Sequence, residues 1–383
     1  MNAESFGSAR VFALALVSTG AWLCIALLPY EVAALADDYH LGTAGAGWVS
    51  TAELLLAAIT SSVIGQSVGK RDKRLLAITG LAIAVGATLG SLLFKNPVPV
   101  VGSRLAFGLG IGLVAAATDA LPALHKSPGR LFAYMQLALG IVFALEVLAV
   151  GAIEPYAGVG SKFIADLLFL VILVPFALML PKGIVLGMPP KPAAGRFKLP
   201  SGSVSALSAL GLMWIAQGVL WAFARSAGTA SGMDADSLVK WFSIAGFTTP
   251  FGAAAAAFLG YRWGYVAPLV IGFLAQIFVA LAEYYFLSRP LFIAGVLVAN
   301  MTTTFTTPYL QAVLASLDRT GRTGAFSGAA VSFGAALGPA IGAFLIGQSV
   351  PDIGVASAVM FFAGLCLAVW SQRSVTPESR PAI

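Results

Sequence analysis

The sequence predicts an all-α integral membrane protein with twelve transmembrane helices in two pseudo-symmetric six-helix bundles. Three observations indicate this fold class: the chain is strongly apolar, its apolar residues gather in runs of about 20 residues, and one basic linker divides the runs into two equal sets. Hydrophobic residues make up 59% of the 383 residues, charged residues make up only 10%, and the mean hydropathy is +0.91. Soluble proteins carry about 25% charged residues, so this composition excludes ordinary soluble domains.

The apolar runs follow one another at short intervals, and each approaches the length of a membrane helix, which needs about 20 residues at a rise of about 1.5 Å per residue. The small residues at 33–36 also suit a signal-peptide cleavage site. The length of the first run and the even number of runs favour a retained first helix instead. The expected segments are 11–31, 45–65, 75–94, 98–122, 131–153, 162–181, 204–225, 239–260, 264–286, 288–316, 324–348 and 352–371.

Residues 182–202 form the longest polar interruption and are rich in Pro, Gly and basic residues, a composition that is typical of linkers. We expect a cytoplasmic linker here, between an N-terminal six-helix bundle at 1–181 and a C-terminal six-helix bundle at 203–383. Two such halves are a common plan among secondary transporters.

The distribution of charge predicts the orientation of the chain. If the N-terminus is cytoplasmic, most Lys and Arg residues fall on the cytoplasmic side, including the linker and the cluster at 70–74. This positive-inside pattern places both termini in the cytoplasm and indicates a multi-pass protein of the bacterial inner membrane. The net charge of +6 then reflects membrane topology, and we expect no nucleic-acid partner.

The loop after the second segment reads GQSVGKRDKR and resembles the Gly-x-x-x-Asp-basic-x-Gly-basic-basic loop of the major facilitator superfamily. Gly69 stands where that family has its Asp, and Asp72 stands where it has its second Gly. In the family the Asp helps to latch the second helix to the eleventh. The resemblance implies a conformational motif here, for which Asp72 is the candidate substitute. The matching positions are Gly65, Lys70, Lys73 and Arg74.

Glycines repeat in the fourth and eleventh segments in patterns that are similar to motifs of the same family. Arg104 begins an Arg-x-x-x-Gly-x-Gly-x-Gly run, and Pro339 lies in a Gly-x-x-x-Gly-Pro-x-x-Gly run. Antiporters of the family carry the second run on their fifth helix, which lacks it here, so the pattern favours efflux only slightly over uptake. We expect these glycines to pack helices closely in lipid, and Pro339 to kink its helix. The glycines are Gly108, Gly110, Gly112, Gly334, Gly338 and Gly342.

Ionisable residues inside membrane segments are costly, and each is a functional hypothesis. Glu53, Arg104 and Glu146 are expected about 10 Å below the outer surface. Because an arginine stays charged while a carboxylate can exchange its proton, we predict Arg104 as a fixed counter-charge. Glu53 or Glu146 is then the protonation switch, with Glu53 preferred and a static ion pair as the alternative. Asp119 lies near the cytoplasmic end of the fourth segment, either as a solvated charge or beside an aqueous path.

The stretch NMTTTFTTPY at 300–309 is unusually polar for a membrane segment. At about 100° per residue, one side of the tenth helix carries five polar residues. Thr302 and Thr306 face the other side, where their hydroxyls are expected to bond to carbonyls one turn back. Five polar groups on one side favour a wet surface over interhelical hydrogen bonds alone. These residues are Asn300, Thr303, Thr304, Thr307 and Gln311.

The resemblance implies that helices one, four, seven and ten line a central cavity. The seventh segment carries Trp214, Gln217 and Trp221 on one face, and the first segment carries Trp22. Aromatic walls with a few polar groups suit a small organic molecule. We therefore predict these four residues and the polar stripe of the tenth segment as substrate-binding, with interfacial anchoring or core packing as the alternative for the tryptophans.

Together these features predict a secondary active transporter that moves a small, neutral to weakly anionic organic molecule by alternating access, coupled to protons. The first alternative is an importer of an aromatic or carboxylate solute, although no second deep basic residue is evident for a dicarboxylate. The second is a lipid flippase-like or non-transporting membrane protein on the same fold. No catalytic or metal-ligand constellation stands out, so we expect no enzyme, cofactor or metal. The expected partners are the substrate, protons and the lipid bilayer, and the expected state is a monomer.

Overall fold

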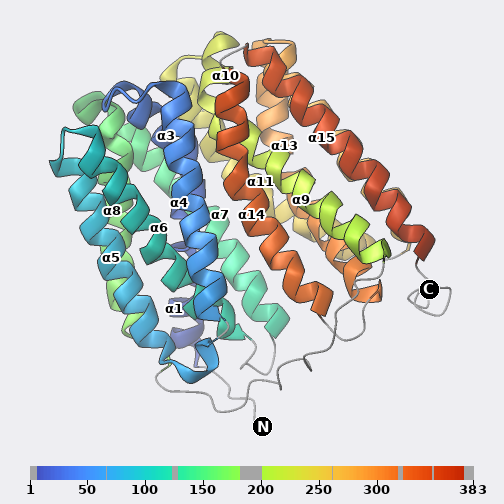
Figure 1. Ribbon diagram of the computed structural model, residues 1–383, viewed down its shortest axis with the longest axis horizontal. Coiled ribbons are helices and arrows are strands. Elements are labelled where there is room, and N and C mark those ends of the chain that lie inside the picture. The colour runs from blue at the N-terminus through green and yellow to red at the C-terminus, as the bar shows by residue number, and fades with distance from the viewer. Residues whose placement is uncertain are drawn as a thin grey trace. The chain divides into compact units, whose positions relative to one another are not determined.

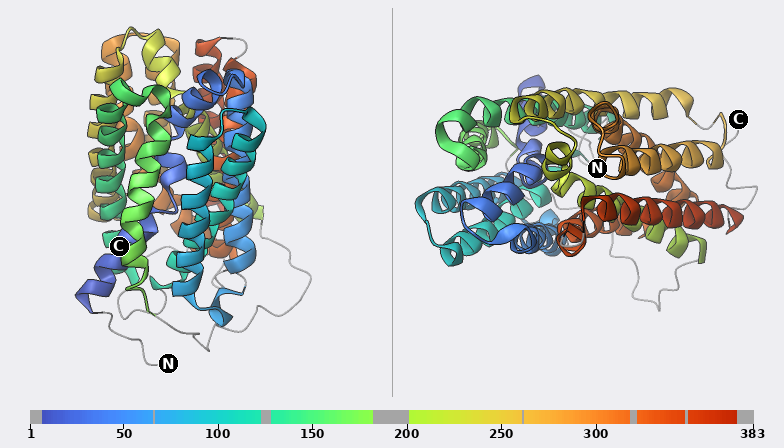
Figure 2. Two further views of the ribbon diagram at one scale, coloured as in Figure 1. Left: turned by 90° about the vertical axis from the view of Figure 1, so that its left-hand side faces the viewer. Right: turned by 90° about the horizontal axis from the view of Figure 1, so that it is seen from above.

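The computed structural model describes residues 7–65, 67–122, 128–181, 201–260, 262–317, 322–346 and 349–374, and these fold into helices without any strand among them. They belong to two compact units, Met1–Pro190 and Lys191–Ile383. The division falls within the expected linker, of which residues 182–200 lie outside the described part. Within each unit the long helices run side by side (Figure 1, Figure 2).

The N-terminal unit contains eight α-helices and two short 3-10 turns, at Val68–Lys70 and Gly158–Gly160, among its described residues. The contacts that build it are α5 on α6, α4 on α6, and α5 on α8. The helices are α1 (Ser8–Thr19), α2 (Leu23–Ala26), α3 (Leu28–Asp37), α4 (Gly42–Gly65), α5 (Lys73–Leu93), α6 (Pro97–Ala120), α7 (Pro128–Ala157) and α8 (Ser161–Ala177).

The C-terminal unit is built around the pairs α9 with α14, α9 with α15, and α11 with α13. It also contains a π-helix at Leu281–Tyr285, directly after α12, and a 3-10 turn at Gln372–Ser374. The α-helices that the structure describes are α9 (Ser201–Ala222), α10 (Ala224–Ala230), α11 (Ala235–Leu259), α12 (Val266–Ala280), α13 (Arg289–Leu317), α14 (Arg322–Ile346) and α15 (Val350–Ser371).

Ten helices in the described ranges are long and apolar enough to cross a membrane. Of the other two expected segments, α8 has only 17 residues, and the first is divided into α1, α2 and α3. The prediction of one continuous helix over 11–31 is therefore wrong. Pro29, which lies in the first turn of α3 and has no N–H to donate to the carbonyl of Ile25, explains the break between α2 and α3. The break between α1 and α2 has no such proline.

The glycines of the fourth segment allow α6 to touch both of its neighbours. A Cβ atom on Gly108 would lie 2.4 Å from the Glu53 carbonyl oxygen of α4, and one on Gly110 would lie 2.6 Å from the Gly80 carbonyl oxygen of α5. The eleventh segment behaves alike, because a Cβ on Gly338 of α14 would lie 2.5 Å from Gly218 Cα of α9. These positions have no room for a side chain, as expected for glycines that let helices pack closely.

We expect Gly108→Ala to destabilise the protein by about 1–3 kcal/mol, since the added methyl group meets backbone that cannot move aside. Gly102→Ala on the same helix is the matched control, because nothing lies within 4 Å of a Cβ at Gly102. There the better helix propensity of alanine should leave stability unchanged or slightly raised. Unfolding of the purified variants by SDS in mixed micelles measures both, and equal stability of the two variants would contradict the packing role.

The loop between α4 and α5 holds the basic motif, and here Asp72 has a local task. Its Oδ1 accepts hydrogen bonds from the backbone N–H groups of Arg74 and Leu75 at 2.9 and 3.2 Å, which caps the N-terminus of α5. Lys73 is buried, and its Nζ lies 3.4 Å from the carbonyl oxygen of Val68. The cap is a sufficient reason for a carboxylate at this position, and the latch role of Asp72 stays a prediction.

If capping is the task of Asp72, Asp72→Ala should cost about 1 kcal/mol of stability, whereas Asp72→Asn should cost only a few tenths, because asparagine caps as well as aspartate. Thermal unfolding in detergent at constant pH compares the two variants. A loss of stability in Asp72→Asn as large as that in Asp72→Ala would show that the charge, rather than the cap, is required.

Candidate functional site

Five ionisable side chains meet in the interior of the N-terminal unit, and we call them the charge cluster. They come from four helices, α3, α4, α6 and α8, and none is more than 1% exposed. Burying charge in a low-dielectric interior costs several kcal/mol per ion unless the charges are paired and hydrogen-bonded. The members of the charge cluster are Glu31, Glu53, Arg104, Lys162 and Asp166.

Arg104 is the centre of this arrangement. Its Nε and Nη2 atoms donate to the two carboxylate oxygens of Glu53 at 2.8 and 2.9 Å, a bidentate pair of the strongest kind. The same Nη2 also donates to Glu31 Oε2 at 2.9 Å. One guanidinium group therefore joins α6 to α4 and α3.

Lys162 is the second cation of the charge cluster. Its ammonium group bonds to Glu31 Oε2 and lies 2.8 Å from Asp166 Oδ2, one turn further along α8. Ser50 Oγ donates to the other oxygen of Glu31 at 3.2 Å. Glu31 thus bridges the two cations, whereas Glu53 contacts Arg104 alone among the cations of the cluster.

Two phenylalanines close the cluster from the side. The guanidinium carbon of Arg104 lies 4.1 Å from the ring centre of Phe107 and 5.2 Å from that of Phe163. Lys162 Nζ lies 5.5 and 5.1 Å from the same two rings. Aromatic faces attract cations, so the two rings add to the attraction that the carboxylates exert on Arg104 and Lys162.

Glu146 lies on α7 and is 1% exposed. Its Oε1 has no hydrogen-bond partner among the residues that the structure describes. The structure therefore pairs Arg104 with Glu53 and Glu31, and it leaves Glu146 outside the charge cluster. Asp119, the fourth ionisable candidate, has an exposed side chain at the end of α6.

Sequence reasoning missed three members of the charge cluster. Lys162 and Glu31 stand at the ends of the expected segments 162–181 and 11–31, where a charge can reach water. The expectation that no second deep basic residue exists is wrong, because Lys162 is fully buried. The available signal was the spacing of Lys162 and Asp166. A basic and an acidic residue four positions apart at the start of an apolar run can pair on one helix face.

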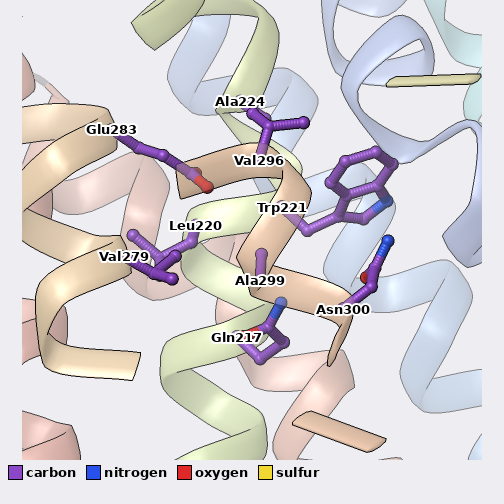
Figure 3. A pocket seen from close by; sticks show the side chains of 9 residues that line it. All are labelled: Gln217, Leu220, Trp221, Ala224, Val279, Glu283, Val296, Ala299 and Asn300. Carbon is purple, nitrogen blue, oxygen red and sulfur yellow. The ribbon is translucent and has the colours of Figure 1, made fainter. Parts of the chain in front are cut away.

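The C-terminal unit contains a small pocket whose free space holds about one water-sized group. Figure 3 shows its lining, to which α9 contributes Gln217 and Trp221, and α13 contributes Asn300. These three residues are among the predicted substrate-binding residues. Glu283 of the π-helix completes the polar lining, and the apolar part consists of Leu220, Ala224, Val279, Val296 and Ala299.

Glu283 is a residue that sequence reasoning missed. It is 3% exposed, and its Oε1 has no hydrogen-bond partner within the described ranges. The neighbouring Tyr284 donates its hydroxyl to the carbonyl of Leu220, which ties the π-helix to the end of α9. Because π-helical turns are rare and often occur at functional sites, the turn draws attention to Glu283. The sequence signal was weak, as Glu283 lies near the end of its segment.

The polar stretch of α13 binds mostly to backbone. Thr302 and Thr306 donate to carbonyls one turn back, as expected, at 2.9 and 2.7 Å. Thr303 and Thr307 do the same at 3.0 and 2.8 Å, so this hydrogen bonding does not distinguish the two sides of the helix. A threonine hydroxyl reaches these carbonyls on any face of a helix.

Two members of the stretch also join α13 to α11. Thr304 Oγ1 donates to the Thr249 carbonyl at 2.9 Å, and Asn300 Nδ2 donates to the Ala245 carbonyl at 3.3 Å. The helices approach closely at Gly252, where a Cβ atom would lie 2.1 Å from the Met301 carbonyl oxygen. Of the predicted polar stripe, only Asn300 lines the pocket, and Gln311 is exposed.

Two predicted tryptophans, Trp22 and Trp214, are not among the residues that line the pocket. Trp22 is half-buried in the break between α1 and α2. Trp214 packs beside α14, where a Cβ atom on Gly334 would lie 2.9 Å from Trp214 Cβ. Its indole Nε1 is buried without a partner in the described structure.

The structure is similar to solved transporters over nearly the whole chain. The nucleoside transporter NupG has a TM-score of 0.72 at 15% identity, covering 95% of this chain and 98% of that chain. The D-xylose-proton symporter has a TM-score of 0.72 at 14% identity, and the match covers 97% of this chain and 98% of that chain. The human organic anion transporter MFSD10 (TETRAN) has a TM-score of 0.64 at 17% identity, and the match covers 94% of this chain and 98% of that chain. No protein-family model and no curated protein sequence matches the chain.

At these identities the likeness shows the fold. Long apolar helices and full-length similarity to solved transporters define the class as multi-pass integral membrane proteins with a transporter fold. Within that class, the chain has the fold of the major facilitator superfamily, in agreement with the motifs of its sequence.

Proposed function

We propose that the chain is a proton-coupled secondary transporter of a small organic molecule, working by alternating access. The observation that supports this most strongly is the charge cluster, which holds three carboxylates against two cations without contact to water. Glu146 adds one more buried carboxylate in the same unit.

An unbalanced charge in a dry interior is unfavourable by several kcal/mol, and a bound proton removes it. Glu53 is the proposed carrier of this proton, because Glu31 contacts both cations and Asp166 pairs with Lys162 on its own helix, whereas Glu53 contacts Arg104 alone among the cations and joins two helices. Protonated Glu53 releases part of Arg104, which Glu31 still holds. The cluster then has two charge states, and a proton gradient can bias two conformations through them.

The pocket of the C-terminal unit is the proposed substrate contact. It combines an aromatic ring, two amides and a carboxylate, a lining that suits a small polar molecule with an apolar part. A buried carboxyl group in this lining favours a neutral or cationic substrate over the weakly anionic one expected from the sequence.

The proposal is tested with the purified full-length protein. A thermal-shift screen of metabolites at two pH values identifies ligands, and uptake into proteoliposomes then measures transport. We expect accumulation that rises with an imposed pH gradient, and the sign of the accompanying pH change gives the direction of transport. Ligand movement that ignores the gradient contradicts proton coupling. Translocation of fluorescent lipid without ligand movement would instead support a flippase.

A further inference from the structure

The pocket of the C-terminal unit has a more specific chemistry than a general substrate contact. We infer that it binds the primary ammonium head group of an organic amine, with Glu283 as the counter-charge. This inference rests on the proposed function, since it names the substrate class of the same pocket.

The carboxylate supplies the first argument. Glu283 is 3% exposed, lines the pocket, and keeps one oxygen without a partner in the part of the chain that the structure describes. Figure 3 shows its carboxylate pointing inward from the π-helix toward the group of lining residues. A buried carboxylate is costly unless a cation or a proton satisfies it. No Lys or Arg is among the lining residues, so a cation that pairs with Glu283 in this pocket is a bound ligand.

Hydrogen-bonding groups supply the second argument. Asn300 donates one of its two amide N–H groups to the Ala245 carbonyl of α11, and its amide oxygen can accept a hydrogen bond. Gln217 brings a second amide group to the lining. Together with Glu283, the two amides give the pocket three side chains that carry acceptor oxygens. An ammonium group has three N–H donors and no acceptor, so its needs match this lining.

Size and the aromatic ring supply the third argument. The free space holds about one water-sized group, which fits a primary ammonium group and is too small for a trimethylammonium group. Trp221 lines the same pocket and is held edge-to-face against Phe242, with ring centres 5.3 Å apart. An indole ring fixed in this way attracts a cation and offers an apolar surface to the carbon beside it.

Binding of 2-phenylethylammonium to the purified full-length protein, measured by calorimetry without any gradient, tests the inference. We expect 2-phenylethanol, phenylacetate and the N,N,N-trimethylated amine to bind at least tenfold more weakly. We expect Glu283→Gln to reduce binding of the amine at least tenfold, while Asp236→Asn, an exposed carboxylate of the same unit, leaves it unchanged.

Three results would overturn the assignment. They are equal binding of the alcohol and the amine, preference for phenylacetate, and an unchanged amine affinity in Glu283→Gln. If Glu283→Gln does not fold, binding of the amine to Trp221→Ala and the comparison of the four ligands on the unaltered protein still test the assignment. Because binding is measured without transport, its failure leaves proton coupling untouched, and a failure of coupling in proteoliposomes leaves amine binding untouched.

Discussion

Replacement of Arg104 by methionine is expected to destabilise the protein by about 3–5 kcal/mol, the usual cost of removing one partner from a buried ion pair. Arg104 makes three charge-assisted hydrogen bonds to Glu53 and Glu31, and all three side chains are at most 1% exposed. Methionine fills much of the volume but leaves two carboxylates with fewer donors. Unfolding by SDS in mixed micelles measures the loss.

Arg71→Met is the matched control, because Arg71 is exposed and lies in the same unit. It should change stability by no more than about 0.5 kcal/mol. The double variant Arg104→Met with Glu53→Gln should recover part of the loss, since removal of one unpaired charge lowers the cost of the other change. If Arg104→Met is as stable as Arg71→Met, the charge cluster does not hold α3, α4 and α6 together.

The features that the sequence predicts correctly are those that depend on the residues of one helix at a time. Apolar runs of membrane length give the segments, because backbone polar groups in lipid must be satisfied within helices. The cost of charge in lipid singled out Arg104 and Glu53, which are indeed partners. The glycine runs predicted that neighbouring helices approach closely, because glycine has no side chain to hold two backbones apart.

The missed residues have a common physical reason. Glu31, Lys162 and Glu283 lie near the ends of their expected segments, where a charge in sequence looks like one that reaches water. These side chains are buried because neighbouring helices pack over them. The position of a residue along its own helix does not show whether another helix packs beside it. The break at Pro29 and the π-helix at Leu281–Tyr285 shift which residues face inward, and a regular count of about 100° per residue cannot anticipate such shifts.

The threonines of α13 illustrate a second limit. Their polarity suggested a wet wall, yet the hydroxyls of Thr303 and Thr307 are satisfied by backbone of the same helix. Thr304 reaches α11 only because Gly252 lets the two helices meet. A helical projection shows one helix, whereas the acceptor that a hydroxyl chooses depends on backbone that lies behind and beside it.

Glu53→Gln is expected to uncouple transport from the proton gradient while the protein still binds its ligand. Glutamine keeps the size of glutamate and mimics its protonated form, but it cannot exchange a proton. A gradient of two pH units stores about 2.7 kcal/mol per proton, enough for about 100-fold accumulation of a ligand moved with one proton. We expect this accumulation to fall at least tenfold in Glu53→Gln.

Exchange of labelled for unlabelled ligand across the same liposomes, which needs no net proton movement, separates uncoupling from a damaged fold. We expect exchange to persist in Glu53→Gln, and Asp352→Asn, at the start of α15, to behave like the unaltered protein. Glu146→Gln is the second arm, because Glu146 is the other buried carboxylate of the N-terminal unit that was predicted as a switch. Should Glu53→Gln retain full gradient-driven accumulation while Glu146→Gln loses it, the proton site belongs to α7 and the charge cluster is structural. Should both variants retain it, coupling by these carboxylates is excluded.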